Sequence, residues 1–375
     1  MEYDFDVRIE RRNTGSNKWS RYGADVLPMW VADMDFAAAP EIIAAITERL
    51  QHPVLGYCVA RPELRQQIVA DMADKYGWTI APEDIVFLPG VEPGFNMAIK
   101  ALLAPGEVLA IQAPIYRPIL TAPRHWDLTR LDFDVDRPIG EQRRTLAMAD
   151  AVLLCNPHNP TGKVYEEDEL RALASATGDK PIISDEIHCE LVFDGRRHVP
   201  IASLDPTIAQ RTITLMSAAK TFNTPGLKAA FAIIQNPELR ARFDGARLGM
   251  VDSVNVLGLE AMLAAFRDCS GWREQVVRYL QGNRDHLFDV VTNRLPGISM
   301  QAPQATYLAW LDCTALGLPD PQGYFLEQAG VAMSAGSDFG SAYGQFVRLN
   351  FGCTRATLEE AVERMARCPV FATPA

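Results

Sequence analysis

Short apolar runs alternate with amphipathic stretches through the middle of this 375-residue chain. Each run has the length of a buried β-strand, roughly four to seven residues, and ends at a turn-forming or polar residue. The stretches between them, such as 166–177, carry apolar residues at helical spacing. The alternation predicts an α/β fold with a mostly parallel sheet and helices on both faces. The runs interpreted as strands are DIVFLPG, EVLAIQAP, DAVLLCNP, KPIISDE, RTITLMS and KAAFAII.

The two ends of the chain follow different patterns. PEIIAAITERL (40–50) predicts a helix with Pro40 in its first turn. Its regularly spaced apolar residues are Ile42, Ile43, Ile46 and Leu50. Further along, 272–295 predicts one long helix with an apolar stripe made of Val276, Leu280, Leu287 and Val291. Two short strands, ATYLAWLDC and QFVRLNFG, precede a last helix in which Thr357 and Glu360 have the spacing of a capping box.

These changes of pattern divide the chain into three regions. A chain of this length exceeds one ordinary core, so more than one domain is expected. We expect an N-terminal arm over residues 1–40, packed with the small domain, and a large α/β domain over 41–270. A small α+β domain over 271–375 completes the chain.

Composition and charge narrow the classes of function. The formal charge of −11 and the lack of a Lys/Arg stripe argue against binding to nucleic acid. No apolar run is long enough to span a membrane, and the N-terminus has no signal-peptide pattern. The cysteines are odd in number and never spaced C-x-x-C, so we expect reduced thiols in a cytoplasmic protein. They are Cys58, Cys155, Cys189, Cys269, Cys313, Cys353 and Cys368.

Polar residues suited to catalysis or ligand binding stand at the ends of the predicted strands, where open α/β sheets bind ligands. Lys220 follows TITLM, and alone it fits either a surface lysine or a desolvated, nucleophilic amine. Asp185 ends another apolar strand, where a carboxylate needs a cationic partner. Gly90 stands between a strand and a helix whose N-terminus can bind an anion, although a plain turn fits equally well. Tyr116 can stack on a planar ligand.

Together these groups match one ligand, pyridoxal 5′-phosphate, which has an aldehyde for the lysine, a ring nitrogen for the aspartate and a phosphate for the helix. The turn CNPHNPTGKVY adds rigidly held asparagines as hydrogen-bond donors, although a plain loop of turn formers also explains it. His158, Asp185 and His188 do not have convincing metal-ligand spacing, so no metal is expected.

With these residues in place, the chain resembles the fold-type I, class I/II aminotransferase superfamily along nearly its whole length. Within it, the chain is similar to the MalY/PatB-type cystathionine β-lyases, also called C–S lyases. The resemblance implies a mostly parallel seven-stranded sheet in a large domain. The superfamily motifs are NPTG (159–162), SDE (184–186), S-x-x-K (217–220) and RLN (348–350). The subgroup motifs are KWS (18–20), PMWVADMDF (28–36), CNPHNPTG (155–162), SDEIH (184–188) and KTFNTPGLK (220–228).

The resemblance also implies roles for single residues. Lys220 forms the Schiff base with the cofactor, Asp185 pairs with the ring nitrogen, and Tyr116 stacks on the ring. Asn159 and His188 hydrogen-bond the phenolic oxygen. The residues implied to hold the phosphate are Gly90, Val91, Ser217 and Lys228, together with Tyr57 of the other subunit of a homodimer with shared sites.

For the substrate, the resemblance implies that Arg348 binds the carboxylate in a bidentate manner, with Asn159 and the backbone of Ala32 beside it. Two positions depart from the family pattern. Glu92 stands where an apolar residue is usual, and a carboxylate there would repel the phosphate unless it points away. SAAK (217–220) replaces the commoner Ser-x-Ser-Lys.

The implied activity is α,β-elimination from L-cystathionine or a related cysteine S-conjugate, giving a thiol, pyruvate and ammonia. In this reaction the amine of Lys220 serves as general base at the substrate Cα. An aminotransferase with a 2-oxo acid acceptor would use the same residues, so the catalytic groups leave both activities open. A catalytically silent regulatory protein is disfavoured because Lys220, Asp185, Asn159 and Arg348 are all present.

Overall fold

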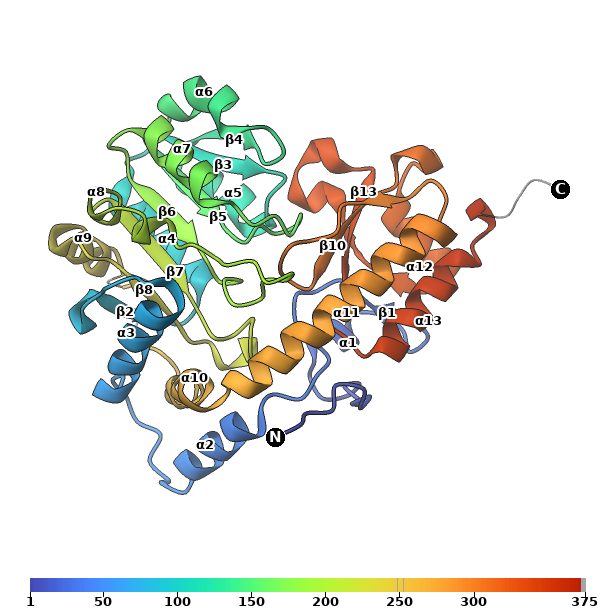
Figure 1. The fold of residues 1–375 in the computed structure, drawn as a ribbon, viewed down its shortest axis with the longest axis horizontal. Helices are drawn as coiled ribbons and strands as arrows, with labels where there is room; N and C mark the ends of the chain where they lie inside the picture. Colours follow the sequence, from blue (N-terminus) through green and yellow to red (C-terminus); the bar gives the residue numbers. More distant parts are fainter. Residues whose placement is uncertain (248, 252, 372–375) are drawn as a thin grey trace.

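A seven-stranded sheet forms the centre of the larger half of the molecule (Figure 1). The computed structural model describes residues 1–247, 249–251 and 253–371. The sheet runs in the order β2-β8-β7-β6-β5-β3-β4, and only β8 is antiparallel to its neighbours. Its strands are β2 (Ile85–Leu88), β3 (Val108–Ala113), β4 (Thr129–Asp134), β5 (Ala151–Cys155), β6 (Ile182–Asp185), β7 (Thr212–Met216) and β8 (Ala230–Ile233). All six predicted runs are strands of this sheet, so the predicted fold class is confirmed.

Helices cover both faces of the sheet, because alternate residues of each buried strand point to opposite sides. Ile111 of β3 packs in the cluster with the first group of helices, and its neighbour Ala110 packs in the cluster with the second. The first group is α4 (Val91–Leu102), α5 (Arg117–His125) and α9 (Pro237–Arg247). The second is α6 (Arg143–Ala147), α7 (Glu167–Thr177) and α8 (Pro206–Ala209).

The smaller half is built on a four-stranded sheet in the order β12-β13-β10-β9. These strands are β9 (Ser299–Met300), β10 (Leu308–Asp312), β12 (Ser334–Ala335) and β13 (Phe346–Asn350). Three helices pack here: α11 (Ser270–Arg294), α12 (Pro321–Ala329) and α13 (Arg355–Ala366). The predicted apolar stripe of α11 is confirmed, since all four of its residues are buried.

The predicted cap of the last helix is wrong. Thr354, not Thr357, is the N-cap of α13, and its hydroxyl accepts a hydrogen bond from the Thr357 amide at 3.1 Å. Thr357 lies inside the first turn and is buried, so its side chain cannot start the helix. Glu360 instead pairs with Arg364 one turn further on.

The N-terminal arm reaches across to the smaller half. Its short helix α1 (Asn17–Ser20) is followed by β1 (Leu27–Pro28), which pairs in parallel with β11 (Val331–Ala332). Ion pairs within the arm hold its early and late parts together. Lys18 donates to the Asp35 carboxylate at 2.7 Å, and Arg11 pairs with the same carboxylate at 2.6 Å. The division into an N-terminal arm (1–40), a large domain (41–270) and a small domain (271–375) stays our proposal.

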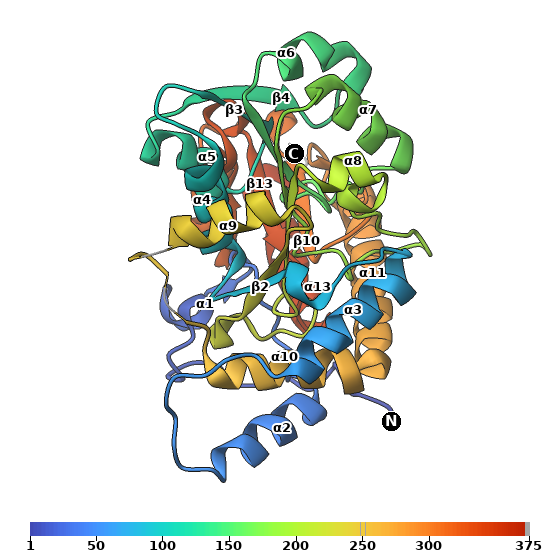
Figure 2. The same cartoon turned by 90° about the vertical axis from the view of Figure 1, so that its left-hand side faces the viewer.

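Helix α2 (Pro40–Leu50) has the predicted bounds, and its apolar face is only partly covered. Ile42 is buried, whereas Ile43 and Leu50 are about half exposed, at 52% and 48%. In Figure 2, α2 lies below α10 (Val256–Asp268), and the connection from α2 to α3 (Pro62–Tyr76) loops outward on the left of both helices.

Candidate active site

A cavity of about 950 Å³ opens where the carboxyl ends of the parallel strands face the smaller half and the arm. The structure brings nearly all the predicted site residues to its wall. They are Ala32, Gly90, Val91, Tyr116, Asn159, Asp185, His188, Ser217, Lys220, Lys228 and Arg348, with Glu92 beside them. Tyr57 does not line this cavity; it lies in the α2–α3 connection and is 93% exposed.

Lys220 follows β7 through a tight turn and points its amine at the arm. Its Nζ donates to the carbonyl oxygen of Ala32 at 2.6 Å. Burial, together with the positive charge of Arg348, lowers the pKa of Lys220 to about 8. A lysine with this pKa has a substantial neutral fraction near neutral pH, which is what a nucleophilic amine requires.

Asp185 is the last residue of β6 and is only 5% exposed. Its Oδ1 accepts from the amide of Ile187 at 3.2 Å. Burial raises the pKa of Asp185 to about 7, because the charged carboxylate is poorly solvated there. A protonated nitrogen placed against this carboxylate would restore its charge and hold it in place.

Arg348 lies in β13 of the smaller half and contacts both the larger half and the arm. Its Nη1 donates to Asn159 Oδ1 at 2.9 Å, and its Nη2 donates to the carbonyl oxygen of Trp30 at 2.8 Å. The ring of Phe339 lies 4.8 Å from the guanidinium carbon. Burial lowers the pKa of Arg348 to about 10, and its buried Nε has no hydrogen-bond partner among the described residues. A buried donor of this kind is suited to a carboxylate ligand.

The first turn of α4 and the Lys228 side chain provide positive potential at another part of the cavity. Gly90 caps α4, so the free amide groups of its first turn face the cavity wall that Gly90 and Val91 form. Lys228 is exposed and has a left-handed backbone (φ 52°). The hydroxyl of Ser217 donates to the carbonyl of Ala229 at 2.7 Å. Ser217 therefore has its proton engaged within the chain, whereas the α4 amides and Lys228 are the cationic and donor groups best suited to a phosphate.

Two aromatic side chains stand beside the site. Tyr116 precedes α5, and burial together with the charge of Glu92 raises its pKa to about 12. Burial lowers the pKa of His188, whose Nδ1 is buried without a hydrogen-bond partner in the described part of the chain. His188 is therefore a neutral imidazole with one ring nitrogen left for a ligand.

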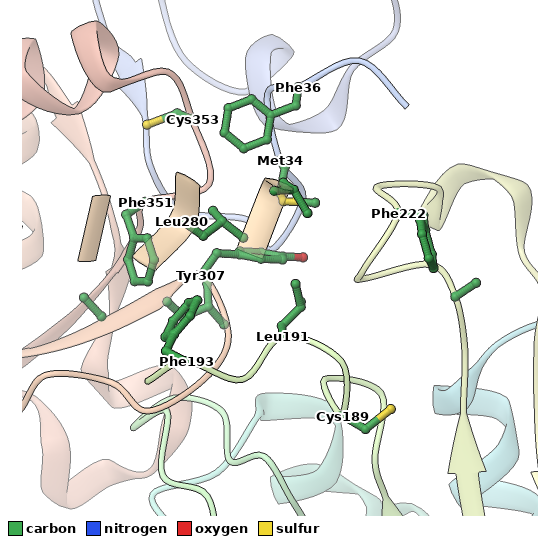
Figure 3. Packing of buried hydrophobic residues seen from close by; sticks show 14 of the residues in the cluster. Met34, Phe36, Cys189, Leu191, Phe193, Phe222, Leu280, Tyr307, Phe351 and Cys353 are labelled. Carbon is green, nitrogen blue, oxygen red and sulfur yellow. The ribbon is translucent and has the colours of Figure 1, made fainter. Parts of the chain in front are cut away.

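The sequence did not reveal two polar residues, Tyr307 and Ser334, that contact the site residues of the arm and of β13. The hydroxyl of Tyr307 donates to the Ala32 carbonyl at 3.0 Å, the same oxygen that Lys220 binds. Figure 3 shows the Tyr307 ring among Met34, Leu191 and other apolar side chains. Ser334 contacts Arg348 Nη2 at 3.3 Å. Tyr307 lies within the run ATYLAWLDC that was predicted to be a strand, although β10 begins one residue later, and this was the only signal available.

The donor set fits pyridoxal phosphate on these observations. The cavity combines an amine of lowered pKa, a carboxylate of raised pKa, a helix N-terminus with a nearby lysine, and a buried guanidinium with an unused donor. Each corresponds to a different functional group of the cofactor or of an amino acid bound to it.

Comparison with known proteins agrees with this site. The chain belongs to the aminotransferase class I and II family, whose model matches residues 24–365. It is 34% identical to the cystathionine β-lyase PatB of Bacillus subtilis, over 96% of this chain and 98% of PatB. The solved structure of OvoB is 43% identical and covers both chains fully, with a TM-score of 0.93. The PLP-bound C–S lyase of Staphylococcus hominis is 29% identical over 98% of each chain, with a TM-score of 0.91.

No helix in the described part of the chain has both the length and the apolar character needed to span a bilayer.

Proposed function

We propose that this protein is a pyridoxal-phosphate-dependent carbon–sulfur β-lyase that acts on L-cystathionine or a related cysteine S-conjugate. The observation that carries the proposal is the convergence of Lys220, Asp185 and Arg348 on one cavity, with their pKa values shifted as described. The similarity to a named cystathionine β-lyase and to a PLP-bound C–S lyase supports the choice of reaction.

In the proposed site, Lys220 would hold the cofactor at its aldehyde carbon and Asp185 at its ring nitrogen. The first-turn amides of α4 and Lys228 would hold the phosphate, and Tyr116 would lie against the ring. When bound, pyridoxal phosphate supplies an electrophilic carbon and a ring that withdraws electrons from the substrate Cα. Asp185 would keep the ring nitrogen protonated, because a cation beside this poorly solvated carboxylate would stabilise its charge.

The remaining steps belong to the chain's own residues. Arg348 binds the substrate carboxylate with the Nε that has no partner within the described residues, and so orients the Cα–H bond. The neutral amine of Lys220 removes the proton from Cα and delivers a proton to the departing sulfur. The Cβ–S bond breaks, and with one added water the products are a thiol, pyruvate and ammonium.

The test measures pyruvate and free thiol from L-cystathionine with no 2-oxo acid present. We expect both products in equal amounts. An aminotransferase would instead consume an amino acid only when 2-oxoglutarate is added, and would give glutamate without free thiol. Formation of glutamate without thiol would overturn the proposal.

We also propose a homodimer with shared sites. The surface of α2 and the connection after it is unusually apolar: Val54, Leu55 and Val59 are 61%, 58% and 88% exposed, and Ile43 and Leu50 lie nearby. Several exposed apolar side chains in one short segment favour a protein–protein interface. Tyr57 projects from the middle of it, as expected of a residue that serves the partner's cavity.

Light scattering should give twice the chain mass, and a mixing experiment tests the sharing of sites. Lys220→Ala and Tyr57→Ala are each expected to be impaired alone. In mixed dimers one site has both native residues, so refolded mixtures should recover about a quarter of wild-type activity. A monomer, or mixtures with no recovery, would contradict the shared-site dimer.

We further propose that the protein works in the cytoplasm. All seven cysteines are free, and all but Cys58 are buried, which favours a reducing compartment. Cell fractionation with compartment markers tests this location.

A further inference from the structure

The cavity wall includes a cation, Arg21, that is not needed to hold the proposed cofactor or the α-carboxylate of a substrate and has no anionic partner among the described residues. Arg117, which also lines the cavity, pairs with Asp338 at 3.1 Å. Glu92 lies beside Tyr116 at the α4 side. Arg21 lines the same cavity but makes no hydrogen bond or ion pair with the described residues. Its positive charge is therefore available to a ligand.

The guanidinium of Arg21 is held in place by aromatic rings. Its carbon lies 4.6 Å from the ring centroid of Trp30 and 5.6 Å from that of Tyr22. Tyr22 packs edge-on against Trp30, with centroids 6.3 Å apart. The indole is fixed in turn, because its Nε1 donates to the carbonyl of Lys18 at 3.2 Å. A cation held over a fixed indole loses less side-chain entropy when it binds an anion.

Trp30 connects this cation to the carboxylate site. Its backbone carbonyl accepts from Arg348 Nη2 at 2.8 Å, while its side chain supports Arg21. The two guanidinium groups therefore flank one residue of the arm. An amino acid bound through its α-carboxylate at Arg348 has its side chain in the same cavity as Arg21.

We propose that Arg21 is a specificity-determining residue that binds a carboxylate at the far end of the departing thiol. This inference rests on the proposed β-lyase function and narrows its substrate class. The preferred substrates are cysteine S-conjugates whose sulfur substituent ends in a carboxylate; L-cystathionine is one of them.

A matched pair of substrates isolates the distal charge. S-(2-carboxyethyl)-L-cysteine and S-propyl-L-cysteine have chains of equal length, and only the first ends in a carboxylate. With the wild-type holoenzyme, kcat/KM for the charged substrate should be higher by about tenfold, the size of one charge-assisted hydrogen bond. The preference should shrink as salt is added, because Arg21 is solvent-exposed.

The variant Arg21→Met keeps an unbranched apolar side chain on Trp30 and removes the charge. It should abolish the preference and leave kcat/KM for S-propyl-L-cysteine within about twofold of wild type. Arg12→Met is the matched control, because Arg12 also stacks on an indole of the arm, 4.8 Å from Trp19, but does not line the cavity. An equal loss for both substrates in Arg21→Met, or a preference that persists, would overturn the inference.

Binding to the cofactor-free protein tests Arg21 separately from the reaction. In calorimetric titrations, the charged compound should bind more tightly than the S-propyl compound, and Arg21→Met should remove the difference. If the wild-type holoenzyme eliminates neither these compounds nor L-cystathionine, the proposed function fails while this binding result still decides the role of Arg21. Equal binding of both compounds to wild type would reject the distal carboxylate site.

Discussion

Lys220 and Tyr307 donate hydrogen bonds to one and the same oxygen, the carbonyl of Ala32, at 2.6 and 3.0 Å. One donor comes from the turn after β7 and the other from the segment before β10, so the arm joins the two halves at the reactive amine. A carbonyl oxygen has two lone pairs, and here both are used. Tyr307 therefore fixes the position of the oxygen against which the Lys220 amine lies.

This shared acceptor makes Tyr307 a positioning residue. Tyr307→Phe should lower kcat by about tenfold, because the amine is less well fixed, and should change KM little. The unfolding free energy should fall by only about 1 kcal/mol, the usual net worth of one hydrogen bond. Steady-state kinetics and urea unfolding measure the two effects. The control is Tyr279→Phe, which removes a hydroxyl that binds Asp6 and the Arg355 amide outside the cavity. Equal kcat values in the two variants would contradict the role of Tyr307.

The lowered pKa of Lys220 predicts the pH at which its amine becomes reactive. In cofactor-free protein, the formation of a Schiff base between pyridoxal and Lys220 should be half-maximal near pH 8. Borohydride reduction followed by peptide mapping measures how much Lys220 has reacted. An ordinary lysine, with a pKa of about 10.4, would need more alkaline conditions. Arg348→Met should shift the midpoint upward, since it removes a neighbouring positive charge. Asp185→Asn should shift it downward, since it removes a negative one. An unchanged midpoint in both variants would show that burial alone sets the pKa.

Glu92, the residue that departs from the family pattern, should act on Tyr116. Burial is the main cause of the raised Tyr116 pKa, and the Glu92 charge adds to it. Glu92→Gln should therefore lower the pKa of Tyr116 from about 12 without returning it to the ordinary value. Ultraviolet titration of the phenolate measures the change, and Tyr116→Phe identifies the signal. An unchanged titration would place Glu92 outside the reach of Tyr116.

The buried pair Lys18–Asp35 should give the arm a stability that depends on pH. Burial opposes the charge of Asp35, but Lys18, Trp19 and Arg11 together outweigh it, so the folded pKa of Asp35 lies below its ordinary value. The stabilisation is then present above pH ~4 and is lost as the pH falls through the folded pKa.

Lys18→Met should lower the unfolding free energy at pH 7 by about 3–5 kcal/mol, because it leaves a buried carboxylate with fewer partners. The deficit should shrink at pH 3, where the carboxylate of the variant is protonated. Urea unfolding at both pH values measures this. The control is Lys100→Met at an exposed position of α4. A deficit that does not depend on pH would exclude the charge as its cause.

The fold and the reactive groups of the site could be read from the sequence because both follow from local patterns. Buried strands are apolar runs, and the chemistry stands where those runs stop, as for Asp185 and Lys220. Strand β4 was not recognised because Thr129, Arg130 and Asp132 face solvent at the sheet edge. An edge strand with a polar face lacks the continuous apolar run by which the other six were found.

The arm contacts could not be predicted, because they use backbone oxygens. Trp30 and Ala32 contribute carbonyl groups that every residue has, so no residue type marks them. The cap at Thr354 was missed because Thr357 and Glu360 match the capping-box spacing, whereas Thr354 is followed three residues later by another threonine. The roles of the cofactor-binding and substrate-binding residues stay predictions.

The arm also sets a length. The carbonyls that hold Arg348 and Lys220 belong to Trp30 and Ala32, two residues apart, so these anchor points are separated by at most about 7 Å of chain. Covalent bonds set this upper limit, which does not depend on how closely the two halves pack. The arm thus limits the distance between the residue proposed to bind the substrate carboxylate, Arg348, and the residue proposed to remove the Cα proton, Lys220. In an amino acid with an extra carbon between its amine and its carboxylate, these two groups would not be placed correctly for Lys220 and Arg348 at the same time.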